Sequence, residues 1–131
     1  MSFQRRACPI VLTVDDDEAV RTVARRVLEL EGYAVKAAPD GPTAIAMLNT
    51  GAELDLLIAD LNMPGMIGEE MVRQIRVTRP DLKVLYLTGY IDRLMDKRQL
   101  WEGEAFLEKP FSFAGLSEAV SLLLHGTIRR R

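Results

Sequence analysis

Acidic side chains in this chain stand where short apolar runs end. Asp15 and Asp16 follow the β-branched run 10–14, and Asp60 follows the apolar run 54–59. Three carboxylates brought together repel one another unless a cation lies among them. Oxygen-only donors of this kind suit Mg²⁺, which binds a few carboxylates and keeps several waters. If the fold unites these segments, the aspartates predict a magnesium site.

Polar residues also end the next two apolar runs. Thr88 closes the run 83–88, and Lys109 follows the run 105–108. Beside a divalent cation and an ammonium group, the carboxylate of Asp60 is suited to attack a phosphoryl group, because carboxylates form aspartyl phosphates. The cation and Lys109 would neutralise charge, and Thr88 would donate a hydrogen bond to a phosphoryl oxygen.

Each of these residues also has a purely structural interpretation. Asp17 and Glu18 suit a helix N-terminus and its dipole, and we interpret them that way. Asp60 alone would start an Asx turn before Pro64, and Lys109 alone would be a solvated lysine. The convergence of polar residues from four separate segments favours the chemical interpretation.

The elements that must position these residues alternate between strands and helices. Strand-like apolar runs lie at 10–14, 34–38, 54–59, 83–88 and 105–108, and helical periodicity follows each, at about 20–30, 42–48, 71–79, 92–101 and 113–124. Such alternation with short connections predicts one α/β domain with an open, doubly wound parallel sheet. Ligands of such sheets bind beyond the carboxyl ends of the strands.

Composition excludes several classes of protein. Hydrophobic residues make up 48% and charged residues 27%, as in a folded domain, and the net charge of -2 argues against direct nucleic-acid binding. No apolar run approaches the roughly 20 residues that cross a bilayer, so we expect no membrane partner. A single Cys8 and a single His125, expected at the surface, exclude an internal disulfide and a multi-thiolate or multi-histidine metal centre. The apolar stretch after Arg5 and Arg6 is too short for a signal-peptide core, so we expect a cytoplasmic protein.

Four segments resemble, in order, the receiver domain of two-component response regulators. They are residues 11–18, 60–68, 87–90 and 106–111, and the match runs from about Ile10 to Leu124. The resemblance implies a flavodoxin-like (βα)5 fold with a five-stranded parallel sheet in the order 2-1-3-4-5. It also implies a single receiver domain over residues 1–131, with a core at about 10–124, a short N-terminal tail and an Arg-rich C-terminal tail.

The resemblance assigns roles to the acidic residues. Asp60 would accept a phosphoryl group from the phosphohistidine of a histidine kinase or phosphotransfer protein. Asp15, Asp16, Asp60 and the backbone carbonyl of Asn62 would hold Mg²⁺, with Asp15 assisting through water. Such a domain is not an enzyme in the usual sense, although it catalyses its own phosphorylation and slow dephosphorylation.

The resemblance also implies a switch. Thr88 and Lys109 would hold the phosphoryl group, and Thr88 with Phe106 would report it to a downstream protein on the face of the fourth helix, fifth strand and fifth helix. The peptide bond before Pro110 should be cis. Residues 100–104 depart from the small Ala- and Gly-rich stretch usual in the family, and this departure concerns the output face.

Alternatives remain at this stage. The domain either acts alone or was excised from a hybrid kinase, and only seven residues follow Leu124. A Mg²⁺-dependent phosphohydrolase with an aspartate nucleophile would instead use Asp15 and Asp17 as paired carboxylates, although the chain is short for a substrate cap. A degenerate receiver that only binds partners would not need the site residues that this chain retains.

Overall fold

The structure is a computed structural model that describes residues 8–63, 65–66, 68–89 and 103–126. Its strands are β1 (Ile10–Val14), β2 (Ala34–Ala38), β3 (Leu56–Asp60), β4 (Lys83–Thr88) and β5 (Glu104–Glu108). Its helices are α1 (Glu18–Leu30), α2 (Gly41–Leu48), α3 (Gly68–Arg76) and α5 (Phe113–His125). The helix expected at about 92–101 lies outside the described residues. No helix in the described ranges combines the length and the apolar character that a membrane crossing requires.

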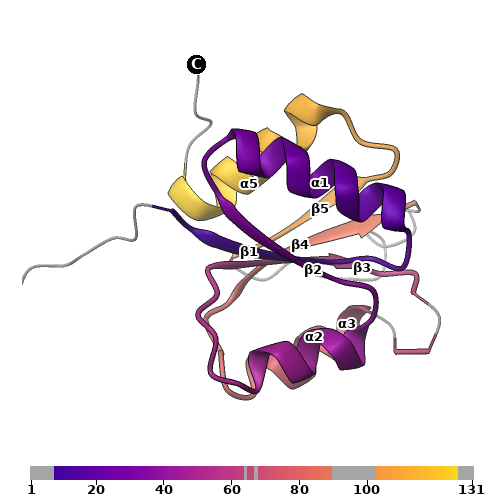
Figure 1. The fold of residues 1–131 in the computed structure, drawn as a ribbon, viewed down its shortest axis with the longest axis vertical. Helices are drawn as coiled ribbons and strands as arrows, with labels where there is room; N and C mark the ends of the chain where they lie inside the picture. The colour runs from indigo at the N-terminus through magenta and orange to yellow at the C-terminus, as the bar shows by residue number, and fades with distance from the viewer. Residues whose placement is uncertain (1–7, 64, 67, 90–102, 127–131) are drawn as a thin grey trace, which may run out of the picture.

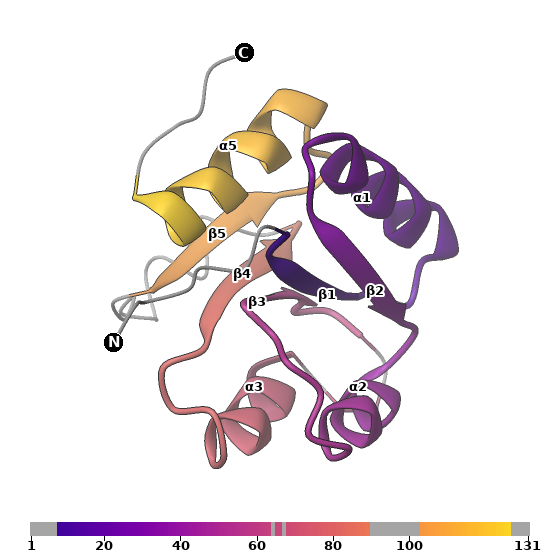
Figure 2. The same cartoon turned by 60° about the vertical axis from the view of Figure 1, so that its left-hand side comes forward.

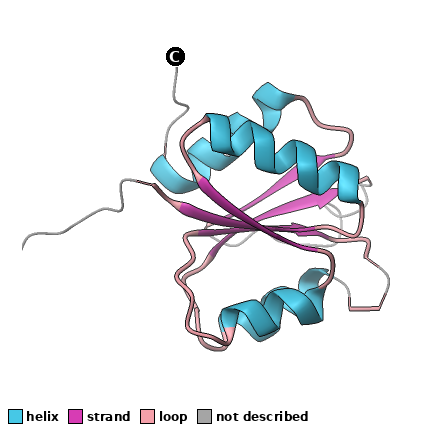
Figure 3. Ribbon diagram, in the orientation of Figure 1, coloured by secondary structure: helices cyan, strands magenta, loops and turns pink. Residues whose placement is uncertain are grey.

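The strands form one parallel sheet in the order β2-β1-β3-β4-β5, which confirms the predicted fold. Figure 1 shows this sheet between two helix layers, with α1 and α5 on one face and α2 and α3 on the other. Figure 2 shows the strand order from β5 at the left to β2 at the right. The same three layers appear in Figure 3 as magenta strands between cyan helices. Both faces of the central strands are therefore buried, as their continuous apolar runs predicted.

Side-chain caps begin three of the helices. Asp17 caps α1, Asp40 caps α2 and Ser112 caps α5, each accepting a hydrogen bond from a backbone N–H of the first turn. These caps satisfy donors that helix geometry leaves unpaired, and the role of Asp17 was predicted from sequence. Gly32, which follows α1, has a φ of 98°, a left-handed conformation that favours glycine.

The third strand differs from its predicted bounds. It begins at Leu56 rather than Leu54 and includes Asp60. The Asp55 carboxylate accepts a hydrogen bond from the backbone N–H of Ile10 at 2.7 Å, so Asp55 serves as a polar cap to β1. At the other end, Leu61 N–H donates to the carbonyl of Leu87, so sheet-like pairing continues past the predicted end.

Two large apolar residues at the ends of helices are exposed. Leu30, the last residue of α1, is 81% exposed because it stands about 200° around the helix from the buried Leu28. Phe113 is 66% exposed although it shares the helical stripe of the buried Leu116, because it is the first residue of α5.

Candidate functional site

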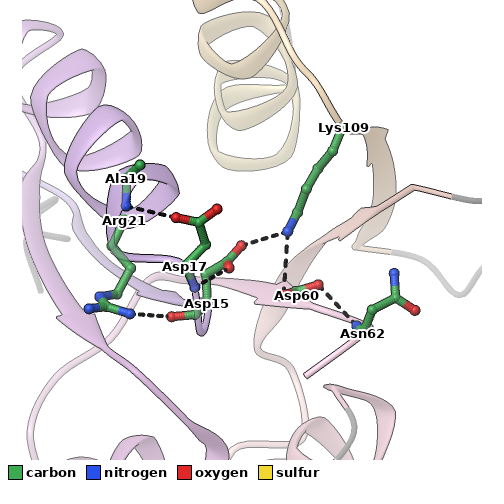
Figure 4. Close-up of polar contacts among 7 residues, drawn as sticks. All are labelled: Asp15, Asp17, Ala19, Arg21, Asp60, Asn62 and Lys109. Atoms are coloured by element: carbon green, nitrogen blue, oxygen red, sulfur yellow. Dashed lines mark hydrogen bonds and ion pairs between the residues drawn. The ribbon is translucent and has the colours of Figure 1, made fainter. Parts of the chain in front are cut away.

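Polar residues meet where the parallel strands end. Asp15 directly follows β1, Asp60 ends β3, Thr88 ends β4, and Lys109 directly follows β5. Asp15, Asp60 and Thr88 are buried, with exposures of 0%, 2% and 1%. The predicted convergence of these segments at one edge of the sheet is thus present in the structure, and Figure 4 shows Asp15, Asp60 and Lys109 there.

The aspartates form an acidic cluster. One carboxylate oxygen from each of Asp15, Asp16 and Asp60 lies within 4.8 Å of the others. Asp16 is exposed while the other two are buried, so the cluster is open to solvent on one side. This is an oxygen-only donor set reached from water, as a hard divalent cation requires.

Local hydrogen bonds fix the turn that carries Asp15. Its Oδ1 accepts from the backbone N–H of Asp17 at 2.9 Å, and its carbonyl accepts from Arg21 Nη1 at 2.7 Å. The carboxylate of Asp17 is turned toward the start of α1, where it accepts from the N–H of Ala19 (Figure 4). Asp17 is therefore a helix cap, as predicted, and is not part of the acidic cluster. Sequence reasoning missed Arg21, although its position one turn into α1 was a usable signal.

Asp60 is held from two directions. Its Oδ1 accepts from the backbone N–H of Asn62 at 2.9 Å, which is the Asx-turn contact expected for an aspartate at this place. Its Oδ2 lies 3.3 Å from Nζ of Lys109. Asp60 can therefore both start the Asx turn and belong to the polar site, because the turn uses Oδ1 and the contact with Lys109 uses Oδ2.

Lys109 bridges the two buried aspartates. Its Nζ lies 2.9 Å from Oδ2 of Asp15, between that residue and Asp60 (Figure 4). Burial acts to lower the pKa of the Lys109 ammonium, but the hydrogen bonds and negative charges of Asp15 and Asp60 outweigh it and raise the pKa. The Lys109–Pro110 peptide bond is cis, as predicted.

The buried oxygen atoms fit a cation. The buried Oδ2 of Asp15 is paired with the Lys109 ammonium, which also pairs with Asp60. One ammonium offsets only part of the negative charge of three clustered carboxylates, and a divalent cation would offset the rest. The donor chemistry of the cluster therefore fits Mg²⁺.

Thr88 and Phe106 lie on the same face of the sheet, on the neighbouring strands β4 and β5, with Thr88 nearer the carboxyl ends of the strands. The carbonyl of Thr88 accepts from the N–H of Lys109 at 2.8 Å, which ties β4 to the residue after β5. Phe106 pairs in register with Tyr86, and their ring centroids are 5.3 Å apart. Sequence reasoning missed this aromatic neighbour, because only the strand register brings the two rings together.

The fold and the site together define a flavodoxin-like α/β domain with an acidic, lysine-bearing edge. The sequence profile of the response regulator receiver domain matches residues 11–121. The chain belongs to the response regulator receiver domain family.

Curated relatives and a solved structure agree with this assignment. The chain is 34% identical to the sensor kinase CckA of Brucella abortus (strain 2308) over 87% of its own length and 12% of the relative. It is 38% identical to the response regulator MprA of Mycobacterium avium (strain 104) over 89% of its length and 51% of the relative. The response regulator TrrA of Thermotoga maritima, solved with Mg²⁺-BeF, matches with a TM-score of 0.77 and 32% identity, over 88% of this chain and 99% of that one.

These comparisons bear on whether the domain belongs to a longer protein and on the phosphohydrolase alternative. The chain spans about half of one curated relative and about an eighth of the other. The phosphohydrolase alternative is not favoured, because the chain belongs to the receiver family and because Asp17, its required second aspartate, caps α1.

Proposed function

We propose that this receiver domain accepts a phosphoryl group on Asp60 from the phosphohistidine of a histidine kinase or phosphotransfer protein. The observation that carries the proposal is the placement of Asp60: its carboxylate belongs to the acidic cluster and lies 3.3 Å from the Lys109 ammonium. A nucleophile in this setting is oriented in advance and lies beside the charges that phosphoryl transfer needs.

Each residue of the site would have a separate role in the phosphoryl transfer. A carboxylate oxygen of Asp60 forms the new O–P bond while the N–P bond of phosphohistidine breaks, and the leaving imidazole keeps the electron pair. Asn62 N–H holds one oxygen of Asp60 in place. Lys109, freed from its bridge between Asp15 and Asp60, would pair with a phosphoryl oxygen, and the Thr88 hydroxyl would donate to another.

Asp15, Asp16, Asp60 and the backbone carbonyl of Asn62 would hold Mg²⁺. When bound, this ion supplies positive charge that offsets the carboxylates and the phosphoryl oxygens. The oxygen-only cluster of three carboxylates, offset by the single ammonium of Lys109, supports this assignment.

We further propose that Thr88 and Phe106 form the switch. A phosphoryl group on Asp60 offers Thr88 a new acceptor, and movement of Thr88 toward it would leave space that the Phe106 ring takes up. A downstream protein would sense this change on the face of the fourth helix, β5 and α5. The domain works in the cytoplasm in this proposal, as one unit over about residues 10–124, and either alone or within a longer kinase.

The experiment is phosphorylation by acetyl phosphate with Mg²⁺, followed by intact-mass measurement and peptide mapping. The wild-type chain should gain one phosphoryl group on the peptide that contains Asp60, and Asp60→Asn should gain none. Asp17→Asn is the matched control and should be phosphorylated normally, because its carboxylate only caps α1. A phosphoryl group on the peptide of Asp15 that persists in Asp60→Asn would refute the proposal.

A further inference from the structure

A buried carboxylate stands at the start of β5, behind the proposed switch. The side chain of Glu104 has 0% exposure. Burying a charge is strongly destabilising unless partners compensate it, so the partners of Glu104 explain how the fold tolerates it.

Oε2 of Glu104 joins three elements. Arg76 Nη1 lies 2.5 Å from this oxygen, and the hydroxyl of Tyr86 donates to it at 3.2 Å. Arg76 ends α3, and its Nη2 donates to the carbonyl of Leu82 at 2.8 Å. The carboxylate therefore ties α3 and β4 to the first residue of β5.

Tyr86 connects this network to Phe106. The two rings are 5.3 Å apart at centroid and tilted by 33°, and their residues pair in register across β4 and β5. The hydroxyl is the single hydrogen-bonding group of the Tyr86 side chain, so its bond to Glu104 anchors the outer end of the Tyr86 ring. Phe106 packs against the ring that Glu104 holds.

We propose that Glu104 is a positioning residue for the Tyr86–Phe106 pair, and that the Arg76–Glu104–Tyr86 network stabilises the resting position of Phe106. This inference rests on the proposed switch. Tyr86 lies two residues before Thr88 on β4. The phosphoryl group, through Thr88, and the network, through Tyr86, would therefore both act on the Phe106 side chain, with opposite effects on its resting position. Loosening the network should depopulate the resting state and thereby favour the phosphorylated one.

The test titrates beryllofluoride, a phosphoryl mimic, in the presence of Mg²⁺ while recording the ring resonances of ¹³C-labelled Phe106. Tyr86→Phe removes the tether and keeps the ring, and Glu104→Gln weakens it with little change of shape. Both variants should shift the Phe106 resonances before beryllofluoride is added. Both should also lower the half-saturating beryllofluoride concentration, by roughly two- to tenfold for the loss of one hydrogen bond.

Tyr33→Phe is the matched control, because the Tyr33 hydroxyl contacts His125 instead of the switch. It should change neither measurement. If Tyr86→Phe behaves like this control, or raises the half-saturating concentration, the inference is overturned. If the wild-type chain binds no beryllofluoride, the proposed function fails, and the resonance shift in the unmodified protein alone decides the role of Glu104.

Discussion

At the scale of single residues, Lys109 is the electrostatic centre of the site. It is the one cation that the described residues place against both buried aspartates. Because the aspartates raise the pKa of Lys109, its charged form is favoured in the folded state. The ammonium thus holds the acidic cluster together when no phosphoryl group or divalent cation is bound.

The raised pKa of Lys109 predicts a pH dependence of stability. The contribution of Lys109 should be fully present below the ordinary lysine pKa of about 10.4 and should be lost as the pH rises through the higher folded-state pKa. Urea unfolding of the wild type and of Lys109→Gln, without divalent cations, measures this difference. The gap in free energy of unfolding should be constant near neutral pH and shrink above about pH 10.4; a gap that grows there would contradict the prediction.

Thr13 has a buried hydroxyl that lowers the stability of the fold. Its hydroxyl is buried in the middle of β1 and has no hydrogen-bond partner among the described residues. Thr13→Val replaces the hydroxyl with a methyl group of similar size and should raise the free energy of unfolding by about 1 kcal/mol. Thr13→Ser keeps the hydroxyl and loses the methyl group, so it should destabilise the protein. Chemical denaturation of the three proteins tests the order Val, Thr, Ser.

At the scale of elements, the docking of α3 shapes the loop after Asp60. Gly68, the first residue of α3, lies so close to β3 that an added Cβ would stand 2.5 Å from the carbonyl oxygen of Asp60. Only glycine allows this approach, because the obstructing atoms belong to the backbone. The start of α3 thereby closes the loop that begins at the proposed phosphoacceptor.

This contact predicts a contrast between two glycines. Gly68→Ala should lower the free energy of unfolding by about 1–3 kcal/mol, since the backbone must shift to make room. Gly41→Ala is the matched control at the start of α2, where an added Cβ would meet the end of the flexible Met66 side chain. Thermal melts should show the larger loss for Gly68→Ala; equal losses would show that the close approach to β3 does not matter.

At the scale of the whole molecule, the acidic cluster exists only in the folded chain. Its members come from the turn after β1 and from the end of β3, which the parallel sheet places side by side. A ligand that binds only the folded state stabilises it by mass action. Binding of Mg²⁺ should therefore be visible as added global stability.

We expect Mg²⁺ to raise the midpoint of thermal unfolding of the wild type, with about 2.7 kcal/mol added at a hundredfold excess over Kd. Asp16→Ala removes a proposed ligand that is exposed and therefore costs little packing. It should lose most of this stabilisation, whereas Asp17→Asn should keep it. An equal response of both variants would show that the acidic cluster is not the magnesium site.

The sequence by itself determined the order of the described strands and helices, the Asp17 cap of α1 and the residues at the strand ends. These features depend on local patterns: apolar runs, turn residues and polar residues at fixed places. The position of Asp60 next to Asp15 also followed, because parallel strands must bring their carboxyl ends to one edge.

Only the tertiary structure decided which oxygen of each aspartate faces Lys109 and that Glu104 is buried. A glutamate near a predicted strand resembles a solvated residue in sequence, because its partners Arg76 and Tyr86 come from other elements. The exposure of Phe113 likewise depends on where the first turn of α5 lies on the sheet, which periodicity does not encode. Long-range packing and strand register set these features, and no local pattern in the chain records them.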